Sequence, residues 1–236
     1  MTNVLIAINV IVYIWEVLSG TQMESFSSLV SHGALYGQLV LQGQWWRIFT
    51  GSFMHAGIWH IALNMFALYQ LGTFVEYALG RWRMLAVYLI SLVGGGIAVV
   101  VFAPNDPTVG ASGAIFGLFG ALFAIGVRLG RRGRALIMQT LPILLLNLAF
   151  TFAVPFISKA GHLGGLFSGF VAGLVLFMTR RPAFADAGVE AAEEAAGEPP
   201  ESESPKASGP KSTNGLMSPR RARRTSDREP NPARLD

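Results

Sequence analysis

The sequence contains no cysteine, and charged residues are scarce over most of its length. The absence of cysteine excludes a disulfide framework and any chemistry that needs a thiolate. Only 14% of the residues are charged, against about a quarter in a typical soluble domain. The deficit falls on residues 1–181, which hold 14 of the 32 charged side chains. A soluble helical core is also excluded, because its helices would need a polar face and these segments are apolar all round.

Apolar residues, by contrast, make up 52% of the chain and gather in long runs. Six runs stand out: 4–18, 55–73, 84–103, 112–127, 135–157 and 162–179. The fourth and sixth are shorter than the roughly 20 residues of a straight span, which is tolerated when a helix begins inside a cavity lined by protein. The sequence therefore predicts an all-α integral membrane protein, with a six-transmembrane-helix bundle over residues 1–181.

Residues 182–236 have a different composition, with eight of the 12 prolines and many Ser, Glu, Ala and Arg. No run in this part can bury a core, so the sequence predicts a disordered tail. The tail is acidic at first and basic later, so the net charge of +4 does not describe one basic face. No aromatic side chains interleave with its basic stretch, and we therefore expect no nucleic-acid partner.

Basic residues in the short connections set the direction of the helices. Eight of them follow the second, fourth and sixth runs: Arg81, Arg83, Arg128, Arg131, Arg132, Arg134, Arg180 and Arg181. The other connections hold only Arg47 and Lys159. Because cytoplasmic loops carry the excess of Lys and Arg, we expect both termini and the tail in the cytoplasm. The second, fourth and sixth runs then all cross from the outside to the inside.

Four polar residues lie near the outer ends of these three parallel runs. His60 and Asn64 stand early in the second, Ser112 starts the fourth and His162 starts the sixth. Their similar depth predicts one water-accessible site that opens to the non-cytoplasmic side. A serine hydroxyl attacks well only when a base takes its proton, and histidine is the usual base. Ser112 and His162 are therefore a candidate dyad, since no acidic residue is placed to complete a triad.

Glycines allow the fourth and sixth runs to approach each other closely. Gly165 and Gly169 follow the histidine on its own helix face, and Gly113 and Gly117 follow the serine. Small residues at this spacing permit contact between the backbones of membrane helices. The helix start also offers N–H groups without intrahelical partners, beside which an oxyanion on the serine would lie. The histidine and asparagine of the second run, four residues apart on one face, can add side-chain donors.

Other interpretations fit less well. A serine between small residues in a membrane helix commonly serves packing, but four polar residues at one depth argue for a site. An α/β-hydrolase elbow needs Gly-x-Ser-x-Gly, and here the last position is Ala114. A transporter would need polar residues down to the inner side, where these runs are nearly all apolar or glycine as far as Glu76.

Several charged residues are interpreted as structural. Arg47 is expected to brace the first loop, roughly residues 19–54, and Glu76 lies too far toward the inner side to orient the candidate base. Glu16 is expected to be paired or to extend toward the membrane surface. For His55, the sequence leaves open a role in the loop and a role in the site.

The motifs WWRIFTGSFMHAGIWHIALNM, GTFVEYALG, GASG and AGHLGGLFSGFVAG occur in this order, after LIAINVIVYIWE in the first run. Together they resemble the rhomboid family of intramembrane serine proteases, of the bacterial type with six transmembrane helices, over most of residues 4–179. The resemblance implies that Ser112 attacks a peptide bond and that His162 acts as base and then as acid. It implies further that His60, Asn64 and the Ser112 N–H hold the oxyanion.

Phe116 stands where the family often has tyrosine, so a ring can still stack on His162. The implied partners are the lipid bilayer and a transmembrane segment of a substrate protein, cut in or near its outer end. No metal or cofactor is expected, and the expected location is the bacterial inner (cell) membrane. The alternative is a catalytically inactive rhomboid-like protein that binds membrane clients. The sequence makes no prediction of the oligomeric state.

Overall fold

The computed structural model describes residues 1–20 and 25–178 of the chain, and this part is helical without a β-strand. The tail at 182–236 and the end of the sixth predicted run lie outside the described residues. Four of the described helical segments are long and apolar enough to cross a membrane: Ile58–Leu79, Arg81–Phe102, Arg134–Ala153 and Lys159–Phe177. Two shorter apolar helices, Thr2–Leu18 and Ser112–Arg128, accompany them. The predicted all-α membrane fold is confirmed.

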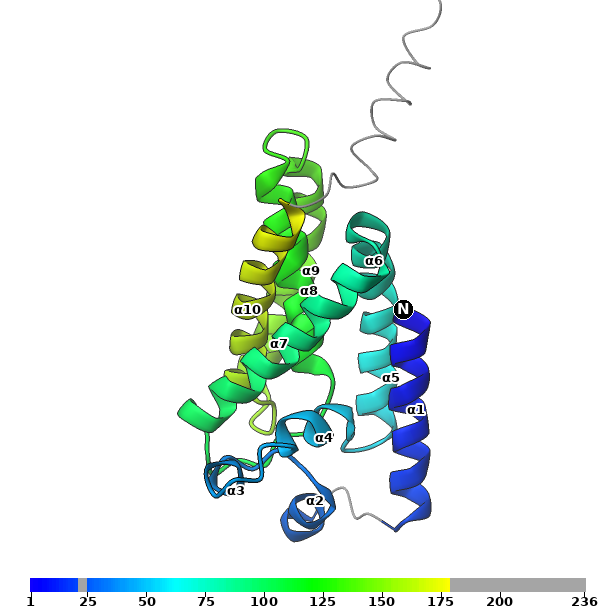
Figure 1. Cartoon of the computed structure of the whole chain (residues 1–236), viewed down its shortest axis with the longest axis vertical. Helices are drawn as coiled ribbons and strands as arrows, with labels where there is room; N and C mark the ends of the chain where they lie inside the picture. The colour runs from blue at the N-terminus through cyan, green and yellow to red at the C-terminus, as the bar shows by residue number, and fades with distance from the viewer. Residues whose placement is uncertain (21–24, 179–236) are drawn as a thin grey trace, which may run out of the picture. The chain divides into compact units, whose positions relative to one another are not determined.

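The described part of the chain forms ten α-helices and one π-helical turn, and Figure 1 labels the α-helices from α1 to α10 in chain order. Their bounds are α1 Thr2–Leu18, α2 Phe26–His32, α3 Gly37–Leu41, α4 Arg47–Phe53, α5 Ile58–Ala67, α6 Thr73–Leu79, α7 Arg81–Phe102, α8 Ser112–Arg128, α9 Arg134–Ala153 and α10 Lys159–Phe177. A π-helical turn, η1 Leu68–Gly72, joins α5 to α6. Figure 1 shows the short helices α2, α3 and α4 at the end of the bundle where α5, α8 and α10 begin.

Several helix ends differ from the predicted runs because local backbone signals override hydropathy. The second crossing helix continues through the π-helical turn and ends at Leu79, where Gly80 adopts a φ of 87°. The fifth stops at Ala153, since Pro155 disfavours helical geometry in the residue before it. The sixth starts earlier than predicted, at Lys159, because the hydroxyl of Ser158 caps the N–H of Gly161.

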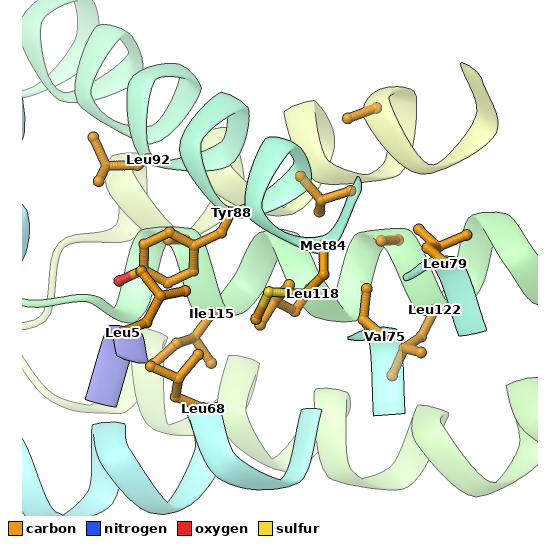
Figure 2. Close-up of a cluster of buried hydrophobic side chains, with 14 of the residues drawn as sticks. Leu5, Leu68, Val75, Leu79, Met84, Tyr88, Leu92, Ile115, Leu118 and Leu122 are labelled. Carbon is orange, nitrogen blue, oxygen red and sulfur yellow. The ribbon is translucent and has the colours of Figure 1, made fainter. Parts of the chain in front are cut away.

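The helix α8 lies at the centre of the described bundle. Most of its side chains are buried, and it packs against α7, α9 and α10. Figure 2 shows part of the core on one side of it, where Ile115 lies beside Leu5, Leu68 and Tyr88, and Leu118 lies beside Met84. A helix buried on nearly all sides needs no polar face and no full membrane span, which is consistent with its short length.

Glycines allow the backbones of α8 and α10 to come into direct contact. A Cβ built at Gly165 would overlap the carbonyl oxygen of Gly113, and one at Gly169 would overlap that of Gly117. A Cβ at Gly113 would meet the Gly161 carbonyl oxygen at 3.3 Å, which is tight but short of overlap. The predicted glycine contact between the two helices is therefore present.

Gly169→Ala is expected to destabilise the bundle by about 1–3 kcal/mol, because the added methyl group overpacks the contact between the two backbones. Gly113→Ala is the matched control, since its Cβ meets only the Gly161 carbonyl, at 3.3 Å. Alanine raises helix propensity more at Gly169, in the interior of α10, than at Gly113, in the first turn of α8. A lower unfolding temperature for Gly169→Ala than for Gly113→Ala therefore reports the overlap. Thermal unfolding in detergent, followed by circular dichroism, measures it. Equal unfolding temperatures for the two variants would contradict the proposed packing.

Two charged residues hold the bundle together outside this contact. The carboxylate of Glu76 pairs with the amino group of Met1 and accepts hydrogen bonds from the N–H and hydroxyl of Thr2, both at 2.7 Å. Arg47, nearly buried, donates to the carbonyl oxygens of Val30 and Ala34 at 2.7 and 2.9 Å. Glu76 therefore fastens α1 to α6, and Arg47 braces the first loop as predicted.

Candidate active site

The structure brings Ser112 and His162 into direct contact. Ser112 is the first residue of α8, and His162 lies in the first turn of α10, so the close packing of the two helices sets their separation. The Nε2 atom of His162 lies 2.7 Å from the Oγ atom of Ser112. His162 is 7% exposed, whereas Ser112 is half-buried. The geometry is that of a hydroxyl bonded to a potential base.

An aromatic ring fixes the plane of the imidazole. Phe116, one turn after the serine, stacks on His162 with ring centroids 4.2 Å apart and an interplanar angle of 18°. The Phe116 side chain is itself buried. The contact matches the stacking that the family resemblance implies, and it needs no hydroxyl on the ring.

The other nitrogen of His162 contacts a residue that the sequence interpretation did not name. Nδ1 lies 2.8 Å from the hydroxyl oxygen of Thr151, near the end of α9. The same hydroxyl donates to the carbonyl oxygen of Asn147 at 2.8 Å. The signal in the sequence was the presence of two polar residues, four apart, in the apolar run LPILLLNLAFTFAVP. Hydroxyls in membrane helices commonly bond to their own backbone, which makes this signal weak.

His60 faces Ser112 across a glycine. A Cβ built at Gly110 would lie 2.9 Å from His60 Nε2 and 3.7 Å from Ser112 Oγ, so these two atoms border the same small space. Gly110 also has a φ of 119°, which other residues rarely adopt. The N–H of Ala56 donates to His60 Nδ1 at 3.2 Å. The neutral ring therefore carries its hydrogen on Nε2, the atom that faces the serine.

Asn64 lies one turn below His60 on α5 and is 6% exposed. Its amide nitrogen donates to the carbonyl oxygen of His60 at 2.9 Å. That bond uses one of the two amide hydrogens, which leaves the second for another acceptor. The first N–H groups of α8, that of Ser112 included, have no partner within the helix. The N-cap residue, Ala111, makes no capping bond with its side chain, so it does not occupy them either.

A buried pair lies behind His60. The ring centroids of His55 and His60 are 5.2 Å apart, and His55 is fully buried. Its backbone N–H donates to a carboxylate oxygen of Glu16 at 3.2 Å, and Glu16 is also fully buried. Burial lowers the pKa of His55 to about 4, so this ring is neutral. Glu16 is therefore buried with a backbone N–H as its partner, forms no ion pair among the described residues and does not extend to the membrane surface. His55 supports the residue that faces the serine.

Within the described part of the chain, no three His, Cys, Asp or Glu side chains gather as metal ligands would. A model of the Rhomboid domain matches residues 42–179, which is more than half of the chain. The chain belongs to the rhomboid family. The matched range holds all the site residues predicted from the sequence, and the resemblance of the motifs is confirmed at the level of the family.

Curated rhomboid relatives come from bacteria, from plants and from Toxoplasma gondii. The chain is 38% identical over 188 residues to the rhomboid protease GluP of Bacillus subtilis (strain 168), and the aligned region covers 78% of this chain and 36% of GluP. It is 36% identical over 158 residues to the mitochondrial RHOMBOID-like protein 6 of Arabidopsis thaliana, and the aligned region covers 65% of this chain and 51% of that protein. It is also 35% identical over 156 residues to the putative rhomboid protease YdcA of Bacillus subtilis (strain 168), and the aligned region covers 62% of this chain and 78% of YdcA.

The aligned regions thus span about a third to a half of the first two of these relatives. Membership of the rhomboid family and the apolar helices identify an integral membrane protein. The two relatives from Bacillus subtilis carry the word protease in their names.

Proposed function

We propose that this chain is an intramembrane serine endopeptidase with Ser112 as the nucleophile and His162 as the general base. The observation that carries the proposal is the 2.7 Å contact between His162 Nε2 and Ser112 Oγ, with Phe116 stacked on the imidazole. A nucleophile within hydrogen-bond reach of an oriented base is the signature of covalent acyl transfer. Membership of a family that contains named proteases supports the same reaction class.

In the first step the Ser112 oxygen attacks the carbonyl carbon of the peptide bond while its proton moves to His162 Nε2. The carbonyl oxygen becomes an oxyanion, for which the Ser112 N–H, the His60 Nε2–H and the second amide hydrogen of Asn64 are the proposed donors. The intermediate then collapses to an acyl ester on Ser112. The amine leaves with the proton that His162 returns to it.

In the second step water attacks the acyl ester. His162 again takes a proton, now from the water, and gives it back to the Ser112 oxygen as the ester bond breaks. The carboxylic acid product leaves and the dyad is restored. The half-buried serine at the end of the bundle is consistent with entry of water at this level.

We propose further that the substrate is a transmembrane segment of another protein, cut in or near its outer end. His60, Ser112 and His162 all lie at the starts of their helices, whereas Arg128 ends α8 at the opposite end. The basic connections argue for cytoplasmic termini and for a site that opens to the non-cytoplasmic side of the bacterial inner membrane. A segment held in the bilayer would present its outer end at this depth.

The test is covalent labelling combined with cleavage. Purified protein in proteoliposomes receives a reporter transmembrane segment, with or without a fluorophosphonate that reacts with activated serines. We expect cleavage of the reporter, loss of cleavage in proportion to labelling, and an adduct on Ser112 in the mass spectrum of the digested protein. Labelling of another serine, or cleavage that persists after complete labelling, would contradict the proposal. Binding of several reporters without cleavage would favour the inactive client-binding alternative.

A further inference from the structure

The Thr151 hydroxyl joins α9 to the candidate dyad. Thr151 is 1% exposed and is one of only three residues buried on α9 among those described, the others being Thr140 and Leu144. Its oxygen lies 2.8 Å from the carbonyl oxygen of Asn147 and 2.8 Å from Nδ1 of His162. Together with the contact between His162 Nε2 and Ser112 Oγ, these form a chain of three short contacts from α9 to α8.

Each of these three contacts needs one hydrogen, and only three are present: one on the Thr151 hydroxyl, one on the neutral imidazole of His162 and one on the Ser112 hydroxyl. The carbonyl oxygen of Asn147 can only accept, so the single hydrogen of the Thr151 hydroxyl is placed there. Thr151 Oγ1 must then accept from His162, which puts the imidazole hydrogen on Nδ1. A neutral imidazole carries one N–H, so Nε2 bears a lone pair and accepts from the Ser112 hydroxyl. The reverse order would turn a lone pair of the Thr151 hydroxyl toward the backbone carbonyl oxygen of Asn147, so two acceptor oxygens would face each other at 2.8 Å with no hydrogen between them.

We propose that Thr151 is a positioning residue that holds His162 in the tautomer able to take the proton of Ser112. The inference rests on the proposed function of the dyad and adds a third member to it, in the place that a carboxylate occupies in Ser-His-Asp triads. Thr151 acts through His162 and touches neither Ser112 nor the peptide bond. As the proton arrives on Nε2, the imidazolium keeps its Nδ1–H bond to the Thr151 oxygen, so the ring stays aligned for the return of the proton.

A purely structural role would look different. Buried or half-buried helical hydroxyls elsewhere in the described chain, such as those of Ser52 and Ser91, donate to the carbonyl four residues earlier. Thr151 makes this bond and in addition accepts from a ring nitrogen. None of the described carboxylates is placed to serve: Glu16 accepts from the backbone N–H of His55, Glu76 holds the start of α1, and Asp106 is exposed in the loop before α8. Thr151 is therefore the acceptor that the fold supplies for Nδ1.

Three variants separate the hydroxyl from the shape of the side chain. Thr151→Val keeps the branched shape and removes the hydroxyl, Thr151→Ser keeps the hydroxyl, and Thr140→Val is the matched control at another buried threonine of α9. A hydrogen bond to a group that becomes charged corresponds to about 10- to 100-fold in rate. We expect Thr151→Val to lower kcat by that factor with KM unchanged, and Thr151→Ser and Thr140→Val to stay within about threefold of the wild type. Equal kcat for Thr151→Val and wild type, or no rescue by serine, would overturn the proposal.

The tautomer itself can be measured without any cleavage. The chain has four histidines, so the ¹⁵N signals of the imidazoles in histidine-labelled protein can be assigned by comparison with His162→Ala. With the ring neutral, we expect a protonated Nδ1 and a bare Nε2 for His162 in the wild type and in Thr140→Val. In Thr151→Val we expect a shift toward the Nε2–H form. An unchanged tautomer would overturn the proposal, whereas a wild type that shows the expected tautomer but cleaves nothing would overturn only the proposed function.

Discussion

Ser112→Ala should reduce cleavage of a transmembrane reporter in proteoliposomes to the level of liposomes without protein. In a well-studied serine protease, removal of the nucleophile or of the base costs about 10⁶-fold in kcat. The 2.7 Å contact with His162 makes Ser112 the hydroxyl that a base can activate. Ser168→Ala is the control, because this α10 hydroxyl bonds only to backbone carbonyls of its own helix, and it should keep wild-type activity.

The same experiment tests whether the two residues act as one unit. His162→Ala should fall to the same background, and the Ser112→Ala/His162→Ala double variant should be no worse than either single one. Residual cutting that is equal in wild type and Ser112→Ala would remove the serine from the mechanism. Further loss in the double variant would mean that the two residues contribute independently, contrary to a dyad.

The sequence predicted the contact between Ser112 and His162 because it depends on features that a linear pattern carries. Both residues lie in the first turn of helices that run in the same direction, and the glycines that follow them occur at helical spacing. Once Gly165 and Gly169 bring the two backbones together, little freedom remains in the distance between the side chains. Burial of α8 on nearly all sides also follows from its short, uniformly apolar sequence.

Features that depend on a third helix were not predictable in this way. Thr151 lies on α9, and no periodicity says which neighbour a buried hydroxyl will face. Glu16 was expected to be paired or to extend toward the surface, and only the packing of α1 against the loop before α5 shows that its partner is the N–H of His55. The π-helical turn at Leu68–Gly72 is equally invisible to hydropathy, as is the extension of the second crossing helix through α6 to Leu79, beyond its predicted end.

Loss of the oxyanion donors should be the next largest effect on catalysis. Asn64→Ala and His60→Ala are each expected to lower kcat by about 10²- to 10³-fold with little change in KM, because such donors act mainly on the transition state. The structure gives each residue a hydrogen to donate: Ala56 fixes the His60 hydrogen on Nε2, and Asn64 needs only one of its two for the His60 carbonyl. Reporter cleavage at saturating and at limiting substrate separates kcat from KM.

His32→Ala is the control for loss of a histidine. The His32 ring bonds to Ser28 within α2, so we expect this substitution to leave kcat and KM unchanged. Higher KM with unchanged kcat in the Asn64 and His60 variants would assign these residues to binding of the substrate in its ground state. Fluorophosphonate labelling supplies a second comparison, because that reaction also builds negative charge on oxygen beside Ser112. If the donors stabilise that charge, labelling by the Asn64 and His60 variants must slow along with cleavage while their unfolding temperatures stay at the wild-type value.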